Sequence, residues 1–296
     1  MNTNTRESPA DIIARVEAAS ERLLTPCGDG HMVWRRWGGT SDKPYLALFH
    51  GNFGSWKHWI HNVTVLSEHF RVLAADIPGF GESAEPPKPY TAHSLATIVA
   101  HGLVEIAGAT APLNVAGFSF GSGTTSEVAH LLGSRVRKAV LVSAGRNMDG
   151  VTRAPMDPFV KWRDMATREE RLAAHRRNLE VIMISNPQRI DDLAVLIQST
   201  NAEQARLRSA FIAKDATHRF VTPQLKCDLA TIWAEHDSTI GPYMHERPIW
   251  LKKYHPNARY GIITDAGHWC SYEQPEQFNR LLPELLYPEG LPASSA

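Results

Sequence analysis

The pentapeptide Gly-Phe-Ser-Phe-Gly at 117–121 constrains the fold of this chain more than any other feature of its sequence. It follows a short apolar run, 113–116, and precedes a stretch of helical character, 122–132. A serine on so sharp a turn takes backbone angles that a Cβ atom resists, so small residues must flank it two positions away on either side. The turn therefore predicts that the hydroxyl of Ser119 is exposed above the strand ends as a nucleophile. From the motif alone, the alternative is an ordinary strand-to-helix turn.

A serine nucleophile needs a neighbouring base, and that base needs an acid that orients it. Asp237 and His268 each come just past a separate short apolar run of β-strand character. The order Ser, Asp, His along the chain, with each residue after its own strand, predicts a catalytic triad. We assign Ser119 as the nucleophile, His268 as the general base and Asp237 as the acid. Asp265 and Glu235 compete with Asp237 by position, because each also borders one of these strands.

Donors for the oxyanion of a tetrahedral intermediate are expected in two loops. The backbone N–H of Phe120, at the start of the helix, is the first. The loop after the buried strand at 45–49 supplies the second, which we assign to the backbone N–H of Asn52, directly after a His-Gly pair. The segment 76–83, which contains a proline and several small residues, is interpreted as a structural turn.

Short apolar strands alternate with helices over most of the chain, and this predicts the α/β class with a mostly parallel sheet covered on both faces. A first helix is expected from a Ser8 cap to about Leu24. Strands are expected near 31–37, 45–49, 70–76, 113–118, 137–143, 229–235 and 258–264, the first two antiparallel at the edge. Helices are expected near 56–68, 91–107, 120–132, 243–253 and 272–286.

The alternation stops between 144 and 225, where the chain has helical character in three pieces, 169–185, 191–199 and 202–212. The segment is too long for a structureless loop. Because it lies after the sixth strand, between nucleophile and acid, it predicts a lid that excludes water and selects substrates. The domain prediction is therefore a core at 1–143, a lid or cap at 144–225, and the rest of the core at 226–296.

Aromatic side chains near the predicted triad and in the lid suggest an apolar substrate pocket. We predict Phe53, Phe118, Trp162 and Trp269 as substrate-binding residues. Simple core packing is the alternative for each of them.

Composition excludes several classes of function. Lys and Arg together number 31, as do Asp and Glu, so no basic field favours nucleic acid or an anionic membrane. The apolar runs are too short to cross a bilayer, and no signal peptide is evident. Three cysteines without paired spacing suit the cytoplasm. We expect a small-molecule substrate, and neither a metal ion nor a nucleotide cofactor, because no ligand spacing or glycine-rich phosphate loop is present. The sequence does not determine the oligomeric state, and a homodimer is one alternative.

Taken together, the motifs resemble the signature set of the α/β-hydrolase superfamily. They are His50-Gly51-Asn52, the 76–83 turn, the 117–121 pentapeptide, Asp237 and Gly267-His268. The resemblance spans about 45–286 outside the lid. It implies an α/β-hydrolase fold with an eight-stranded, mostly parallel sheet flanked by helices, and a serine hydrolase activity that needs no cofactor.

The C-terminal segment is further similar to meta-cleavage-product hydrolases, which cut carbon–carbon bonds in ring-fission products of aromatic catabolism. Gly-His-Trp at 267–269, followed by Tyr272-Glu273 and Phe278-Asn279, carries this resemblance. That subfamily implies a lid arginine that holds the substrate carboxylate, and Arg206 and Arg208 are the candidates. The chain departs from the subfamily beside the serine, where it has Phe instead of Asn before it and instead of Met after it.

The favoured function is therefore the hydrolysis of a small, largely apolar ester, as in carboxylesterases. Cleavage of a carbon–carbon bond in a vinylogous diketone acid is the first alternative. Acyl transfer to an acceptor other than water is a second. A non-catalytic ligand-binding homologue is the alternative from another class, and the intact Ser119, Asp237 and His268 argue against it.

Overall fold

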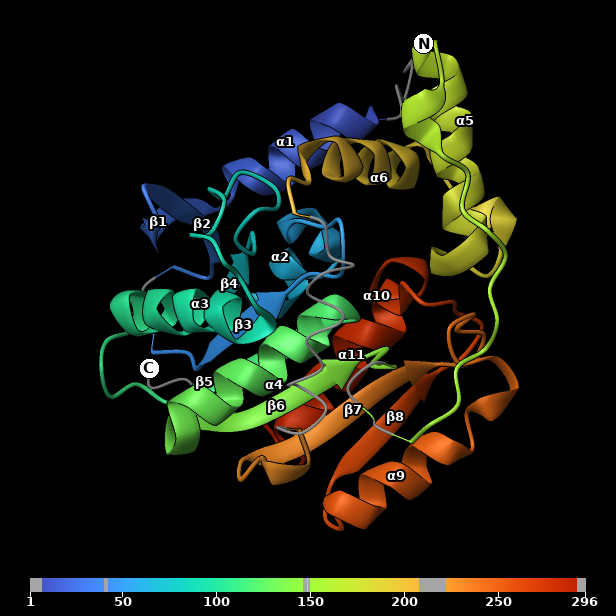
Figure 1. Ribbon diagram of the computed structural model, residues 1–296. Helices are drawn as coiled ribbons and strands as arrows, with labels where there is room; N and C mark the ends of the chain where they lie inside the picture. The colour runs from blue at the N-terminus through green and yellow to red at the C-terminus, as the bar shows by residue number, and fades with distance from the viewer. Residues whose placement is uncertain (1–6, 40–41, 146–147, 149, 208–221, 292–296) are drawn as a thin grey trace, which may run out of the picture.

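An eight-stranded sheet forms the centre of the computed structural model, which describes residues 7–39, 42–145, 148, 150–207 and 222–291 (Figure 1). The strand order is β1-β2-β4-β3-β5-β6-β7-β8; β2 pairs antiparallel with β1 and β4, and the other neighbours are parallel. The strands are β1 (Glu21–Cys27), β2 (Gly30–Trp37), β3 (Tyr45–Phe49), β4 (Arg71–Ala75), β5 (Leu113–Phe118), β6 (Val136–Val142), β7 (Asp228–Ala234) and β8 (Arg259–Ile263). The predicted α/β-hydrolase sheet is thus confirmed.

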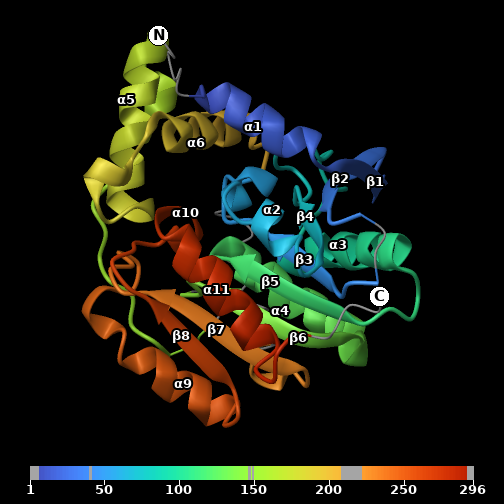
Figure 2. The same ribbon diagram turned by 180° about the vertical axis from the view of Figure 1, so that it is seen from behind.

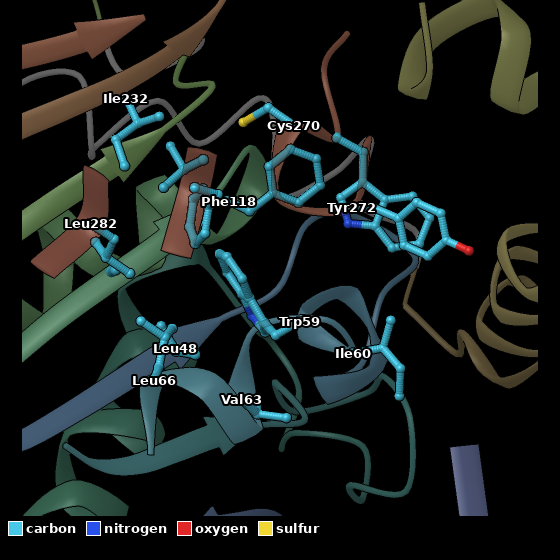
Figure 3. Close-up of a cluster of buried hydrophobic side chains, with 14 of the residues drawn as sticks. Leu48, Trp59, Ile60, Val63, Leu66, Phe118, Ile232, Cys270, Tyr272 and Leu282 are labelled. Carbon is cyan, nitrogen blue, oxygen red and sulfur yellow. The ribbon is translucent and has the colours of Figure 1, made fainter. Parts of the chain in front are cut away.

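Helices cover both faces of this sheet (Figures 1 and 2). One face packs against α3 (Ala92–Ala107), α4 (Phe120–Leu132) and α9 (Glu246–Tyr254). The other packs against α2 (Val63–Leu66), α10 (Cys270–Glu273) and α11 (Pro275–Leu286). Figure 3 shows part of this second core, where Trp59 and Phe118 lie among aliphatic side chains of the strands and of α11. No helix in the described part of the chain has the length and apolarity to cross a membrane.

The N-terminal region differs from the prediction. Helix α1 (Pro9–Ala18) begins as expected, because the Ser8 side chain accepts a hydrogen bond from the backbone N–H of Asp11, but it does not continue to Leu24. Strand β1 follows instead and forms a hairpin with β2. Its last residues alternate between buried and exposed side chains, which is the period of a strand with one covered face.

Strand β3 was predicted at an antiparallel edge, and this was wrong. It lies inside the sheet, parallel to β4 on one side and to β5 on the other. All five of its residues are buried. An unbroken apolar run of this length is typical of a central parallel strand with helices on both faces.

Residues after β6 form a mostly helical segment. In both views α5 (Arg168–Asn178) and α6 (Asp192–Gln204) lie beyond one end of the sheet, and α6 runs beside α1 (Figures 1 and 2). A π-helix, η4 (Leu179–Met183), continues α5. The start of the helix predicted at 202–212 belongs instead to α6, which ends at Gln204; 208–212 lie outside the described residues.

Two further predicted helices are interrupted. The helix expected at 56–68 is the short η1 (Trp56–Trp59) followed by α2. The helix expected at 272–286 is interrupted at Gln274, which lies between α10 and α11 in a non-helical conformation because Pro275 follows it. The remaining short helices are η2 (Gly133–Arg135), η3 (Trp162–Asp164), η5 (Pro187–Arg189), η6 (Thr222–Gln224) and η7 (Gly241–Tyr243).

Candidate active site

Ser119 lies on a strained turn between β5 and α4. Its φ is +50° and its ψ is −108°, a backbone conformation that side chains with a Cβ rarely adopt. Its N–H donates to the carbonyl of Val142 at 2.8 Å, which ties the turn to β6. A Cβ atom at Gly117 would lie 2.1 Å from the carbonyl oxygen of Gly121, and one at Gly121 would lie 2.2 Å from that of Phe49. The expectation that small residues must flank Ser119 two positions away is confirmed.

The structure brings the three predicted triad residues together. The Ser119 hydroxyl lies 2.8 Å from Nε2 of His268, and Nδ1 of His268 lies 2.8 Å from Oδ2 of Asp237. Asp237 and His268 are 1% and 3% exposed. Because a carboxylate only accepts hydrogen bonds, Nδ1 carries the ring proton, and Nε2 is free to accept from the serine.

Thr239 holds the carboxylate of Asp237 from the other side. Its N–H and its hydroxyl donate to Oδ1 at 2.9 and 2.7 Å. Burial alone would raise the pKa of Asp237, but electrostatic attraction to His268 and the hydrogen bonds from His268 and Thr239 outweigh it and hold that pKa below its usual value. Thr239 was not predicted from the sequence, although an Asp-x-Thr pattern after a strand is a signal for such a turn.

The two competitors for the acid are occupied elsewhere. Asp265 forms an ion pair with Arg189 at 2.5 Å. Glu235 accepts a hydrogen bond from the backbone N–H of Asp265. Neither side chain is a hydrogen-bond partner of His268, whose two ring nitrogens bond Asp237 and Ser119.

The loop that carries His268 is fixed from two directions. Ser143, at the end of β6 and with a φ of +49°, donates its hydroxyl to the carbonyl of His268 at 2.9 Å. The buried carboxylate of Glu273 accepts from the N–H of Gly267 at 2.7 Å. The same carboxylate accepts from the N–H and hydroxyl of Ser185, both at 2.9 Å. Glu273 therefore connects the histidine loop to the helical segment after β6.

The two loops assigned to the oxyanion lie at the same cavity as Ser119. Phe120 is the first residue of α4, and the first N–H groups of a helix have no acceptor within it. Asn52 precedes Phe53, whose φ is +50°, and its side-chain oxygen accepts from the N–H of Phe53 at 3.0 Å. A positive φ in a residue other than glycine marks a loop held in a costly conformation.

A cavity of about 660 Å³ opens beside Ser119 and His268. Its wall is largely apolar and comes from both the core and the segment after β6. Apolar lining residues are Phe53, Phe118, Phe120, Met156, Phe159 and Trp162. Among the described residues, three cationic side chains also line it, namely Arg153, Lys161 and Arg163. No pattern in the sequence distinguishes these three from the other basic residues of the chain.

Two predicted substrate-binding residues are not among the described residues that line this cavity, and these predictions were wrong. Arg206 donates from its guanidinium to the carbonyls of Gly81 and Ser83, so it holds the 76–83 turn. Trp269 is fully buried and donates from its indole to the carbonyl of His58 at 2.8 Å. The residue directly after His268 in the sequence thus points into the core. Arg208 lies outside the described residues.

The placement of possible metal ligands bears on the expectation that no metal ion is bound. Among the described residues no group of three or more His, Cys, Asp or Glu side chains is placed to hold a metal ion.

Comparisons with known proteins agree with this fold. Residues 44–275 match the family model described as the alpha/beta hydrolase fold. The dihydrolipoyllysine-residue acetyltransferase component of the acetoin cleaving system of Cupriavidus necator is 25% identical over 95% of this chain and 73% of its own length. The 2-hydroxy-6-oxononadienedioate/2-hydroxy-6-oxononatrienedioate hydrolase of Paraburkholderia phymatum is 22% identical over 93% of this chain and 99% of its own. A solved carboxylesterase from Bacillus subtilis has a TM-score of 0.67 at 18% identity and covers 95% of this chain, with 99% of its own covered.

Proposed function

Because this chain belongs to the alpha/beta hydrolase fold family and is a hydrolase, we propose that it cleaves a small, largely apolar ester with Ser119, His268 and Asp237 as its catalytic triad. The observation that best supports this is the unbroken chain of hydrogen bonds from the serine hydroxyl through the imidazole to the carboxylate, both at 2.8 Å. The Ser119 end of this series of hydrogen bonds lies at a largely apolar cavity, which suits an apolar acyl group.

The reaction follows from the direction of these bonds. Nε2 of His268 takes the hydroxyl proton as Oγ of Ser119 attacks the ester carbonyl carbon, and Asp237 stabilises the imidazolium that forms. The N–H groups of Asn52 and Phe120 hold the resulting oxyanion. The intermediate collapses, the alcohol leaves with the proton from Nε2, and water then attacks the acyl-enzyme with the same base. A positioned base contributes about 10²–10⁴-fold in rate, and one oxyanion donor about 3–4 kcal/mol.

The segment 144–225 is proposed as a lid over this site. Met156, Trp162 and His175, all from that segment, line the same cavity as Ser119. The cavity volume of about 660 Å³ falls within the roughly 300–1,000 Å³ of small-molecule sites, so a single small substrate would fill it. Because the lid supplies much of the wall, substitutions there should change substrate preference more than they change the chemistry.

Carbon–carbon bond hydrolysis is the second candidate, and two observations favour it. One relative is named as a hydrolase of 2-hydroxy-6-oxononadienedioate. In addition, the cavity contains cationic side chains that could pair with a substrate carboxylate, with the Arg163 guanidinium also 4.4 Å above the Trp162 ring. A neutral ester would need no such pairing.

A panel of neutral p-nitrophenyl esters and one dienoate ring-fission acid tests the proposal. We expect wild-type turnover of at least one ester to exceed turnover of the dienoate, and Arg163→Gln to leave that ester's turnover nearly unchanged. Arg206→Gln is the matched control, because that guanidinium binds the 76–83 turn outside the cavity. Dienoate turnover above every ester, with a selective loss in Arg163→Gln, would favour the second candidate. No turnover of either class would favour a ligand-binding protein.

A further inference from the structure

Two buried histidines beside the Asn52 loop have no part in the mechanism above. His50 and His58 are 0% and 1% exposed, and their rings lie 6.1 Å apart. Both bond the backbone of Gly51, the residue directly before Asn52. Nδ1 of His50 lies 2.7 Å from the Gly51 carbonyl oxygen, and Nδ1 of His58 accepts from the Gly51 N–H at 3.2 Å. Gly51 is therefore held at both of its polar groups.

These bonds determine where each ring carries its proton. A carbonyl oxygen only accepts, so Nδ1 of His50 is protonated, and its Nε2 accepts from the N–H of Ile77 at 2.9 Å. Nδ1 of His58 accepts, so its proton is on Nε2. Burial lowers the pKa of His50 to about 4, and burial with the nearby His50 and His268 lowers that of His58 well below its usual value. Both rings are neutral near pH 7.

The peptide bond between Gly51 and Asn52 joins this pair of histidines to the reaction. The Gly51 carbonyl and the Asn52 N–H belong to one planar trans unit, in which they point in opposite directions. Fixing the carbonyl with the His50 N–H therefore fixes the direction of the Asn52 N–H. A hydrogen bond to the carbonyl also polarises the same peptide and strengthens its N–H as a donor.

Packing leaves this loop little freedom to find another arrangement. A Cβ atom at Gly51 would lie 2.8 Å from the ring of Phe118, which directly precedes Ser119. One at Gly54 would lie 2.5 Å from the ring of His58. The His58 ring also packs 5.6 Å from that of Phe118. The imidazole of His58 thus fills the space between the Asn52 loop and the strand that carries the nucleophile.

We propose that His50 and His58 are positioning residues that clamp Gly51 and aim the Asn52 N–H at the oxyanion of the tetrahedral intermediate. The inference rests on the proposed function, in which Asn52 is an oxyanion donor. It predicts a specific loss in kcat, because the contact is used mainly in the transition state.

A comparison of an ester with its thionoester isolates this role. The thionoester develops negative charge on sulfur, a larger and weaker acceptor that gains less from a well-aimed N–H. His58→Leu should lower kcat for the ester by about 10–100-fold, less than the roughly 10²–10³-fold of removing an oxyanion donor outright. It should lower kcat for the thionoester much less and leave KM for the ester nearly unchanged.

Two variants serve as controls. His58→Asn places an amide oxygen where Nδ1 lies and should restore most of the ester kcat. Asn114→Leu removes hydrogen bonds to the Tyr45 carbonyl and the Tyr287 hydroxyl near the start of strand β5, away from the cavity. It should lower the melting temperature while leaving the ester-to-thionoester ratio of kcat as in the wild type. A purely structural effect of His58 would resemble that of Asn114→Leu.

Equal losses on the two substrates in His58→Leu would overturn the inference. Should that variant not fold, His50→Gln takes its place, because it keeps an acceptor for Ile77 but removes the donor to Gly51, and the same unequal loss is expected. If ester hydrolysis depends on Ser119 but the ester-to-thionoester ratio of kcat is unchanged in these variants, only the positioning role of His50 and His58 is refuted. Ester hydrolysis that persists in Ser119→Ala would refute the proposed function and this inference with it.

Discussion

Replacing His50 by Gln should make the free energy of unfolding of this protein less dependent on pH in the acidic range. Burial lowers the pKa of His50 from 6.5 to about 4. Between these values the unfolded chain binds a proton that the folded protein does not, so the free energy of unfolding falls as the pH drops from about 6.5 to about 4. Each pKa unit corresponds to about 1.4 kcal/mol, so protonation linked to His50 alone lowers the free energy of unfolding by about 3 kcal/mol over this pH range. Below about pH 4 it lowers the free energy of unfolding no further.

Other groups titrate in the same region, so the comparison must be between the wild type and the variant. His58 acts in the same direction as His50. Burial raises the pKa of Asp76, which acts in the opposite direction, because the folded protein takes up that proton first. The lowered pKa of Asp237 affects stability only below about pH 3.8, its ordinary value. These contributions are common to both proteins and largely cancel in the difference.

Urea unfolding followed by the fluorescence of the eight tryptophans measures that difference. His50→Gln should be less stable than the wild type at pH 7.5, because the hydrogen bond to Gly51 is lost. At pH 5.0 the gap should narrow by about 2 kcal/mol, the share of the His50 contribution between pH 6.5 and 5.0. An equal gap at the two pH values would show that His50 does not stay neutral in the folded protein, and would refute the argument from its burial.

Three further predictions concern the rest of the site. Asp237→Asn should lower kcat by about 10⁴-fold, because it favours the wrong imidazole tautomer of His268, whereas Asp265→Asn should change kcat little. The reverse ranking of the two variants in ester assays would contradict the assignment of Asp237 as the acid. Glu273→Gln places an NH₂ group opposite backbone N–H donors, so the melting temperature of the variant should fall by several degrees and its kcat by about 10-fold. An unchanged kcat at the lower melting temperature would show that the position of the His268 loop does not depend on Glu273. Gly121→Ala should unfold at least about 3 kcal/mol more easily, since its Cβ meets the Phe49 carbonyl; near wild-type stability in urea would contradict the close approach.

The sheet and the placing of three side chains could be predicted from the sequence because both depend on local order. Ser119, Asp237 and His268 each follow an apolar strand, and parallel strands bring their carboxyl ends to one edge. The flanking glycines were predictable for the same reason, since the conformation of the turn is a property of a few consecutive residues. The start of α1 followed from its Ser-Pro pair in the same way.

What could not be predicted depends on the direction of side chains and on contacts between distant segments. Trp269 is next to His268 in sequence but points into the core, and Arg206 binds a turn more than a hundred residues earlier. The burial of β3 was predicted, but its central and parallel place in the sheet was not, because the neighbours of a strand depend on pairing between distant segments. Glu273 joins the loop of His268 to Ser185 through hydrogen bonds that only the folded arrangement reveals.

Covalent labelling by a fluorophosphonate, located by mass spectrometry of the digested protein, tests the central assignment most directly. The reagent reacts with a serine that a neighbouring base activates, and the 2.8 Å contact between Ser119 and His268 predicts that activation. We expect one phosphonylated peptide, containing Ser119, in the wild type. We expect no labelling in a folded Ser119→Ala variant, whose ester turnover should be about 10⁶-fold lower. Labelling at another serine, or a Ser119→Ala variant that keeps more than about a hundredth of wild-type turnover, would contradict the account.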